Sequence, residues 1–411
     1  MKINQKKQLA PLPLFDSLEY INNQSPPASL SSTQKNDFLM SVSFLKSYVG
    51  SLGTFNSYRR EVERLLHWTW IVVKKTIKEL KREDIENFIR FCQKPPKTWI
   101  GVKKAPRFID KEGIRISNIE WRPFVVTISK AAHRKGVNAD IDHFELSQGA
   151  VKESFAILST FYNYMLQEEY VFMNPVALIR QKIKFIRKQQ HQTQIRRLSP
   201  LQWDYVIETA TLMADRDSKK HERTLFIMTA LYSMYLRISE LSASVRWAPQ
   251  MNHFYRDNDG NWWFKTVGKG NKERSIAVSN NMLNALKRYR KHLGLSTLPS
   301  VADKTPLLLK IKGKEPITSS TYIREIVQSC FDKAINKLQE DKHFEEAELL
   351  NEATVHWLRH TGISEDVKTR PREHVRDDAG HCSSATTDKY IDVALRERHQ
   401  TAKNKPILSD T

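Results

Sequence analysis

The stretch HWLRHT at residues 356–361, followed by AGH at 379–381 and by Tyr390, decides how this chain can be interpreted. His356 and Arg359 are three residues apart, which places both side chains on one face of a helix. An arginine fork suits the paired non-bridging oxygens of a phosphate, and imidazoles beside it can donate to the same oxygens or move a proton. A phenol nearby can be the nucleophile of a covalent step. The order of these residue types therefore predicts chemistry at a phosphate group.

This ordered set resembles the second catalytic motif of the tyrosine recombinases, the phage integrase family. In that motif His-x-x-Arg-His-Thr is followed by Gly-His and then by the catalytic tyrosine. Here the step from Arg359 to His381 is 22 residues, and the step from His381 to Tyr390 is nine. The segment 365–378 departs from the family pattern, because TRPR at 369–372 replaces a continuous helix.

Two further motifs extend the resemblance upstream. LRISEL at 236–241 resembles the first motif of the family, with Tyr235 where the family usually has glycine. Glu240 is expected to orient an arginine or to cap a neighbour. GKGNK at 268–272 lies between expected strands at 262–267 and 274–278, and resembles the hairpin tip whose lysine enters the minor groove beside the scissile phosphate.

The resemblance implies a set of six catalytic residues, which are Arg237, Lys269, His356, Arg359, His381 and Tyr390. The tyrosine would attack the scissile phosphorus, and the two arginines would hold its non-bridging oxygens. The lysine would protonate the departing 5′ oxygen, and the two histidines would donate to the phosphate or accept the proton of the tyrosine. Because the protein link keeps the energy of the phosphodiester, no metal ion or other cofactor is expected.

Composition agrees with a nucleic-acid partner. The chain has 411 residues, a net charge of +20 and a pI near 9.7, and such an excess of positive charge favours a polyanion. The three cysteines are widely separated, which argues against a disulfide framework or a structural zinc site. The N-terminus has no apolar segment of signal-peptide type, and no apolar run is long enough to span a bilayer. We therefore expect a cytoplasmic, nucleoid-associated protein with no membrane partner.

Basic residues outside the motifs are candidate DNA contacts. Between 180 and 197 there are seven Lys or Arg and no acidic residue, so this segment would cross the phosphate backbone as a linker. A cluster of arginines also lies on the polar side of the helix expected after Thr54. The candidates are Arg59, Arg60, Arg64, Lys182, Lys184, Arg187 and Lys188.

The predicted fold is mainly α, with a small antiparallel β-sheet in the C-terminal catalytic domain, and the resemblance implies a two-domain, C-shaped clamp on DNA. Its parts would be a flexible N-terminal tail (1–34), a helical, SAM-like core-binding domain (35–185) with an insertion at about 94–144, a basic linker (186–198), the catalytic domain (199–392) and a C-terminal tail (393–411) that contacts the neighbouring protomer. The insertion is expected to be a partly ordered loop followed by a helix near 123–134. Ser199 and Pro200 predict the start of the first helix of the catalytic domain.

The function predicted from the resemblance is site-specific recombination of double-stranded DNA, for integration or excision of a mobile element. Four protomers would act on two DNA sites, with accessory DNA-bending proteins as further partners. A type IB topoisomerase uses similar chemistry and stays an alternative, as does a DNA-binding relative that has lost catalysis. A zinc hydrolase is disfavoured, because Trp357 stands where the pattern HExxH needs its glutamate.

Overall fold

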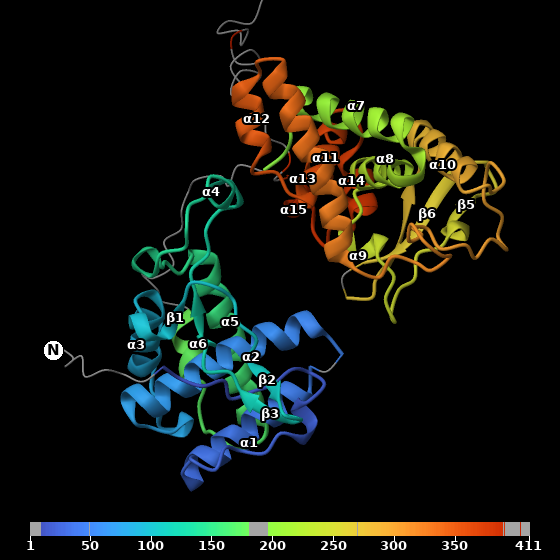
Figure 1. Cartoon of the computed structure of the whole chain (residues 1–411). Helices are drawn as coiled ribbons and strands as arrows, with labels where there is room; N and C mark the ends of the chain where they lie inside the picture. The colour runs from blue at the N-terminus through green and yellow to red at the C-terminus, as the bar shows by residue number, and fades with distance from the viewer. Residues whose placement is uncertain are drawn as a thin grey trace, which may run out of the picture. The chain divides into compact units, whose positions relative to one another are not determined.

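The computed structural model describes residues 10–48, 50–180, 196–268, 270–388, 390 and 403, without the side chains of 178, 180 and 385. The chain divides into two compact units, Met1–Gln190 and His191–Thr411 (Figure 1). Both units are mainly helical, and the second unit has a small antiparallel sheet, as predicted; the small sheets of the first unit were not predicted. Within the described residues, no helix is long and apolar enough to cross a membrane.

The first unit is built on six α-helices of the described chain, with a core of aliphatic and aromatic side chains between them. Their bounds are α1 (Ser32–Lys46), α2 (Leu52–His67), α3 (Arg82–Gln93), α4 (Lys130–Arg134), α5 (Gln148–Gln167) and α6 (Pro175–Arg180). Capping chemistry sets where these helices begin. At α6, for example, Asn174 Oδ1 accepts from the backbone N–H of Val176 at 3.0 Å, and Pro175 occupies the first helical position.

The N-terminal segment is not a free tail, and the prediction of a flexible segment over 1–34 is wrong for residues 10–34. Phe15 is fully buried, and the backbone N–H groups of Leu14 and Phe15 donate to Glu63 Oε1 at 2.6 and 3.2 Å. Asp16 forms a bidentate pair with Arg115, whose Nε and Nη2 lie 2.6 and 2.9 Å from its carboxylate oxygens. Composition suggested a loop because it does not report these long-range contacts.

The segment 94–144 contains strands where a loop was expected, and the helix predicted over 123–134 is found only at α4. β1 (Ile100–Gly101) pairs in parallel with β4 (Phe124–Val125), and β2 (Phe108–Lys111) pairs antiparallel with β3 (Ile114–Ser117). Both residues of the β2–β3 turn have positive φ, 54° at Glu112 and 78° at Gly113, as a tight primed turn requires. The side chain of Phe124 is fully buried, and this tertiary contact outweighs helix propensity.

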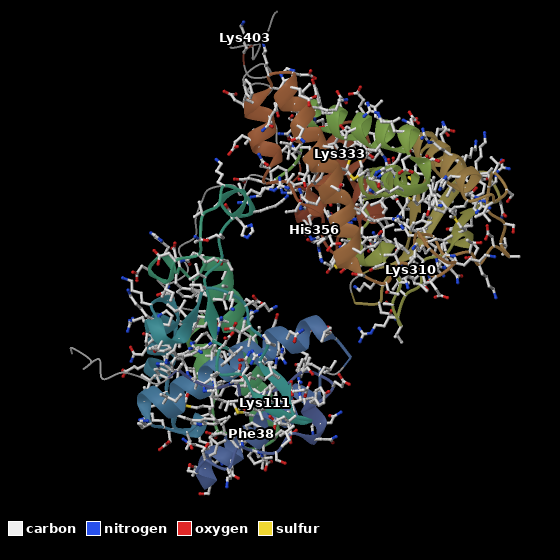
Figure 2. The ribbon with its side chains drawn as sticks, in the orientation of Figure 1. Phe38, Lys111, Lys310, Lys333, His356 and Lys403 are labelled. Atoms are coloured by element: carbon white, nitrogen blue, oxygen red, sulfur yellow. The ribbon has the colours of Figure 1, made fainter. Side chains whose placement is uncertain are left out.

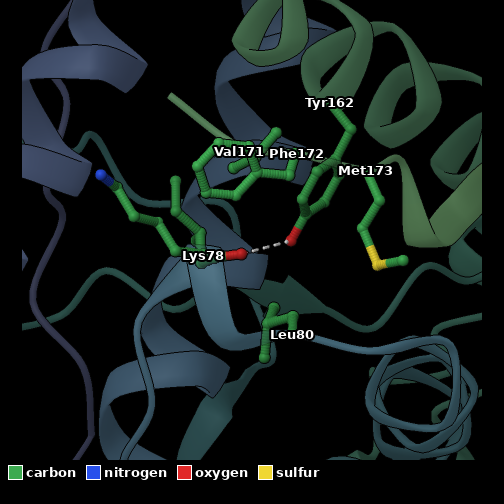
Figure 3. A pocket seen from close by; sticks show the side chains of 7 residues that line it. Lys78, Leu80, Tyr162, Val171, Phe172 and Met173 are labelled. Atoms are coloured by element: carbon green, nitrogen blue, oxygen red, sulfur yellow. Dashed lines mark hydrogen bonds between the residues drawn. The ribbon is translucent and has the colours of Figure 1, made fainter. Parts of the chain in front are cut away.

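A surface hollow of about 200 Å³ lies between the loop after α5 and the turn before α3 (Figure 3). Tyr162 Oη donates to the carbonyl of Ile77 at 3.1 Å along its floor. Asp37 holds the same region, because its carboxylate accepts from the Tyr170 hydroxyl at 2.8 Å and from the backbone N–H of Ile77 at 3.1 Å. Phe172, which also lines the hollow, is 99% exposed.

The second unit surrounds a three-stranded antiparallel sheet with helices. In chain order its elements are α7 (Pro200–Arg216), α8 (Ser218–Ser233), α9 (Ile238–Leu241), β5 (Phe254–Arg256), β6 (Trp262–Val267), β7 (Glu273–Ala277), α10 (Asn280–His292), α11 (Ser320–Glu340), α12 (Phe344–Leu350), α13 (Val355–Asp366), α14 (Arg372–Ala379) and α15 (Ser384–Asp388). The sheet order is β5-β6-β7, which confirms the two predicted strands to within one residue. Ser199 caps α7 with Pro200 at the first position, also as predicted.

Helices α7, α8, α10, α11 and α13 pack against one another around the main core of this unit. Figure 1 shows the sheet and α12 at opposite ends of it. A smaller apolar cluster lies beside this core and consists of Tyr235, Ile363, Val375, Ala379 and Tyr390. This small cluster brings together the segments that carry the two motifs of the sequence.

Candidate active site

Helix α13 is the support on which the site is built. Leu358 and Ile363 are fully buried on its inner side, and Gly362 faces the carbonyl of Tyr232 on α8. A Cβ atom added at Gly362 would lie 2.1 Å from that carbonyl oxygen, so only glycine permits this approach. The close packing of the two helices fixes the position of the residues that precede Gly362, Arg359 and His360.

Arg359 is buried, with 5% of its surface exposed, and backbone carbonyls orient its guanidinium. Nη1 donates to the carbonyl of Tyr235, and Nη2 donates to the carbonyl of Ala379 at 2.6 Å. Burial, and then the charge of Arg237, lower the pKa of Arg359 to about 10, so it stays charged at neutral pH. A guanidinium has five N–H donors, and the two carbonyls take two of them, which leaves donors for an anion.

Tyr235 is the residue that stands in place of the family glycine. Its φ is +49°, a left-handed conformation that a large side chain rarely adopts, and its side chain is buried. The hydroxyl is hydrogen-bonded to the carboxylate of Asp366, and Arg370 Nη1 donates to the same hydroxyl at 2.9 Å. Arg370 Nη2 also donates to Asp378 Oδ2 at 2.6 Å. The two departures from the family pattern, Tyr235 and the segment 369–372, are therefore in direct contact.

Glu240 organises the first motif, as expected, by capping and by orienting arginines. Its Oε2 accepts from the backbone N–H of Arg237 at 2.7 Å, and its Oε1 accepts from Arg237 Nη1 at 3.1 Å. Arg274 on β7 reaches the same carboxylate with Nη1 at 2.7 Å and Nη2 at 2.9 Å, and its Nε donates to the carbonyl of Asp378 at 2.9 Å. One buried carboxylate thus connects the sheet, the start of α9 and the end of α14.

Tyr390, the last residue of the second motif, lies close to Arg359 and Arg237. Its ring is 7% exposed within the small apolar cluster, and its Oη lies 2.6 Å from Nδ1 of His360. The rings of Tyr390 and His381 are stacked, with centroids 5.7 Å apart. Burial raises the pKa of Tyr390, whereas the charges of Arg359 and Arg237 oppose that rise. The phenol therefore needs a proton acceptor at neutral pH.

The three histidines of the site are neutral at pH 7. Burial first, and then the nearby arginines, lower the pKa of His381 to about 4. Burial, Arg359 and His356 lower the pKa of His360 to about 4 as well, and burial with Arg324 lowers that of His356. His356 lies in the first turn of α13 (Figure 2). Neutral imidazoles can each donate one hydrogen bond and accept another.

The structure brings together Arg237, His356, Arg359, His381 and Tyr390 of the predicted catalytic set. Lys269 lies outside the described residues, and so do Lys182, Lys184, Arg187 and Lys188. His360 was missed as a member of the site, because its position four residues after His356 was weighed only as a zinc-ligand spacing. The available signal was its place in the second motif, next to Arg359.

The arginines of α2 that were candidate DNA contacts have partners within their own unit. Arg64 donates from Nε and Nη2 to the carbonyl of Pro123 at 2.9 and 2.8 Å and is largely buried. Arg59 donates to the carbonyl of Asp16. Arg60 pairs with Glu61 at 2.6 Å and keeps 37% of its side chain exposed. These contacts explain Arg59 and Arg64 as structural residues.

Within the described residues, no group of three or more His, Cys, Asp or Glu side chains could hold a metal ion. The described side chains of the site carry guanidinium, imidazole and phenol groups. Two positive charges beside a buried hydroxyl suit an anionic substrate that becomes covalently attached.

Comparisons with known proteins agree with this interpretation. Residues 205–397 match the phage integrase family model, which covers nearly all of the second unit. The chain is 24% identical over 305 residues to the tyrosine recombinase XerC of Staphylococcus epidermidis, covering 72% of this chain and 85% of that protein. It is 22% identical over 292 residues to XerC of Pelobacter propionicus, covering 67% and 83% of the two chains.

Two solved structures share the fold. The XerH site-specific recombinase bound to palindromic difH substrate superposes with a TM-score of 0.55 at 14% identity, over 94% of this chain and 93% of that one. The Tn1549 transposon integrase in complex with a circular intermediate DNA superposes with a TM-score of 0.50 at 14% identity, over 89% and 98%. These two structures show the same fold, and the family model with the XerC relatives identifies the chain as a member of the phage integrase family, the tyrosine recombinases.

Proposed function

We propose that Tyr390 is the nucleophile of a reversible strand transfer on double-stranded DNA. Its Oη attacks the scissile phosphorus, a phosphotyrosyl bond forms at the 3′ side, and the bond to the 5′ oxygen breaks. The reverse attack by a 5′ hydroxyl rejoins a strand. The observation that carries this proposal is the position of the Tyr390 hydroxyl, which is buried beside Arg359 and Arg237 and hydrogen-bonded to an imidazole. One phosphodiester is exchanged for another, so the reaction needs no external energy source.

The remaining residues of the site have complementary roles. Arg237 and Arg359 hold the non-bridging oxygens and stabilise the negative charge of the transition state. His356 donates to the same phosphate, and His381 positions Arg359, from whose Nη2 its Nε2 accepts. Lys269 protonates the departing 5′ oxygen, an assignment that rests on its place in the GKGNK run. Because stabilisation of charge usually lowers the barrier of such reactions more than any other effect, loss of either arginine should cost more than loss of one imidazole.

The partner that we propose is a duplex recombination site. Four protomers would act on two sites through a Holliday junction, assisted by DNA-bending proteins, in the cytoplasm at the nucleoid. The resemblance to the XerH complex with difH substrate and to the Tn1549 integrase complex with circular intermediate DNA supports a specific DNA site and a role in integration or excision of a mobile element.

The test is covalent capture of DNA. The purified chain is incubated with fragments of its host DNA, denatured and analysed for a protein–DNA adduct, whose DNA is then sequenced. Wild type is expected to form the adduct at a discrete sequence, and Tyr390→Phe is expected to bind DNA without forming it. Tyr205→Phe is the matched control, because Tyr205 is bonded to Asp341 away from the site.

Three results would contradict the proposal in different ways. An adduct with Tyr390→Phe would mean that another nucleophile reacts. An adduct at every sequence, with relaxation of any supercoiled plasmid, would indicate a type IB topoisomerase. DNA binding without an adduct in wild type would indicate a relative that has lost catalysis.

A further inference from the structure

We propose that His360 is the general base that takes the proton of Tyr390 during strand cleavage, a role that rests on the proposed function of Tyr390. His360 Nδ1 lies 2.6 Å from Tyr390 Oη, within the distance that direct proton transfer requires. The ring centroids are 5.4 Å apart and the planes are tilted by 35°. His360 lies on α13 next to Arg359, so the group that binds the phosphate and the group that activates the nucleophile share one rigid support.

The other imidazoles of the site are directed elsewhere. His381 Nε2 faces Arg359 Nη2 at 3.4 Å, and its Nδ1 faces Thr387 Oγ1 at 2.9 Å. A guanidinium only donates, so Nε2 of His381 must accept and its Nδ1 carries the hydrogen that Thr387 accepts. His381 in this tautomer has no lone pair for the phenol. For His356, the described structure shows no hydrogen bond to Tyr390. His360 is thus the imidazole placed to accept.

Electrostatics supply the required protonation state. Among the described residues, the charged or titratable groups that interact with His360 are Arg359 and His356 on its own helix and His381 and Tyr390 from the facing segments. Burial, Arg359 and His356 lower the pKa of His360 to about 4, so the ring is neutral at pH 7, and in the tautomer with its hydrogen on Nε2 the lone pair of Nδ1 faces the phenol. A bound phosphodiester carries a negative charge that offsets the arginines, which raises the basicity of His360 when the substrate is in place.

The step balances without a co-reactant. The Oη–H proton moves to His360 Nδ1 as Oη forms its bond to phosphorus, so no free phenolate needs to accumulate. The bond from phosphorus to the 5′ oxygen breaks, and that oxygen takes a proton from the general acid, Lys269. In the rejoining step the 5′ hydroxyl attacks, Oη leaves, and His360 returns the proton to it.

The experiment compares single-turnover cleavage by wild type, His360→Ala and His360→Asn on a duplex that carries the sequence recovered from covalent adducts. The asparagine can accept the same hydrogen bond but cannot take a proton, so it separates positioning from proton transfer. Both variants are expected to bind the duplex as wild type does and to cleave it about 10²–10³-fold more slowly at pH 7. His343→Ala is the matched control, since His343 packs on Tyr205 outside the site.

A second substrate identifies which proton is involved. In this duplex sulfur replaces the bridging 5′ oxygen, and a thiolate leaves without protonation. The His360 variants should stay slow on it and should become faster as the pH rises, because hydroxide then removes the phenol proton. A variant that lacks the general acid should instead recover on this substrate.

Several results would overturn the assignment. If His360→Asn cleaves within about threefold of wild type, the imidazole only positions the phenol. If sulfur restores the His360 variants, His360 acts at the leaving group. If wild type forms no adduct at all, the proposed function itself fails, which is a distinct outcome. Thermal melting and DNA binding of each variant identify any loss of folding.

Discussion

Substitution of Glu240 by glutamine removes one charge and keeps the shape of the side chain. Glu240 is 1% exposed, and its carboxylate accepts two hydrogen bonds from Arg274, at 2.7 and 2.9 Å, and two from Arg237. In the variant, the amide NH₂ of the glutamine must face guanidinium N–H groups. Arg274, whose side chain is 10% exposed, is then left as a buried charge without its counter-ion.

Breaking a buried pair by removing one partner costs about 3–5 kcal/mol, and the hydrogen bonds that glutamine retains place Glu240→Gln near the lower end, about 3 kcal/mol. For a unit of this size, 1 kcal/mol lowers the melting temperature by about 2–4 °C, so the expected decrease is roughly 6–12 °C. Because Arg237 loses the group that orients it, cleavage should also fall at temperatures where the variant is folded.

The pH dependence has a defined sign. Burial alone would raise the pKa of Glu240, but the bonds and charges of Arg274 and Arg237 lower it below the ordinary value of 4.5. The carboxylate therefore stabilises the fold above about pH 4.5, and this contribution is lost as the pH falls through the folded-state pKa. The difference between wild type and Glu240→Gln should be largest at neutral pH and should shrink in acid.

The measurement is thermal unfolding by circular dichroism from about pH 2 to pH 8, together with adduct formation at 25 °C. Glu222→Gln is the matched control, because Glu222 is also buried and accepts from Arg288 Nε at 2.6 Å, away from the site. Glu222→Gln should have a lower melting temperature than wild type and should cleave DNA at the wild-type rate. A Glu240→Gln protein that melts within 1 °C of wild type, or that cleaves at the wild-type rate, would refute the reasoning.

Three other measurements test separate features of the chain. Gly362→Ala should lower stability by at least about 1–3 kcal/mol, because its Cβ would overlap the carbonyl of Tyr232, and a melting temperature equal to that of wild type would show that α8 and α13 can separate easily. Tyr235→Phe should weaken cleavage more than DNA binding, since the hydroxyl that accepts from Arg370 is lost while the backbone carbonyl that orients Arg359 remains. Equal losses in a gel-shift and a cleavage assay would argue against a positioning role. DNA affinity measured against salt should have a log–log slope of roughly −5 or steeper, and a flat response would mean that the basic residues do not contact phosphates.

The sequence alone predicted those structural features that depend on residues close together in the chain. The order and spacing of the motif residues predicted a group of side chains, Arg237, His356, Arg359, His381 and Tyr390, that the structure brings together, because each lies within a helix or next to the end of one. Ser199 and Pro200 identified the start of α7, since capping depends on a few adjacent residues. The strands β6 and β7 were found for the same reason, from a short alternation around two turns.

The parts that were missed depend on contacts between distant residues. Leu14 and Phe15 are held by Glu63, which no composition of the N-terminal segment reveals. The helical pattern predicted that Arg64 lies on the surface. In the structure it is largely buried, because it donates to the carbonyl of Pro123, 59 residues away. His360 was overlooked because its contact is with Tyr390, 30 residues away in the sequence.

The packing of the Tyr390 ring also leads to a prediction about cleavage by an assembly of several copies. The ring lies against Ile363 and Val375 of its own chain and is bonded to its own His360. If this tyrosine acted in the site of a neighbouring copy, its ring would leave this cluster, at a cost of about 1.5–3 kcal/mol, and the hydrogen bond would break. Each copy should therefore cleave the phosphate that its own arginines hold. A mixture of Arg359→Ala and Tyr390→Phe proteins on one duplex should accordingly form no adduct, and cleavage by this mixed pair would show that the tyrosine is exchanged between subunits.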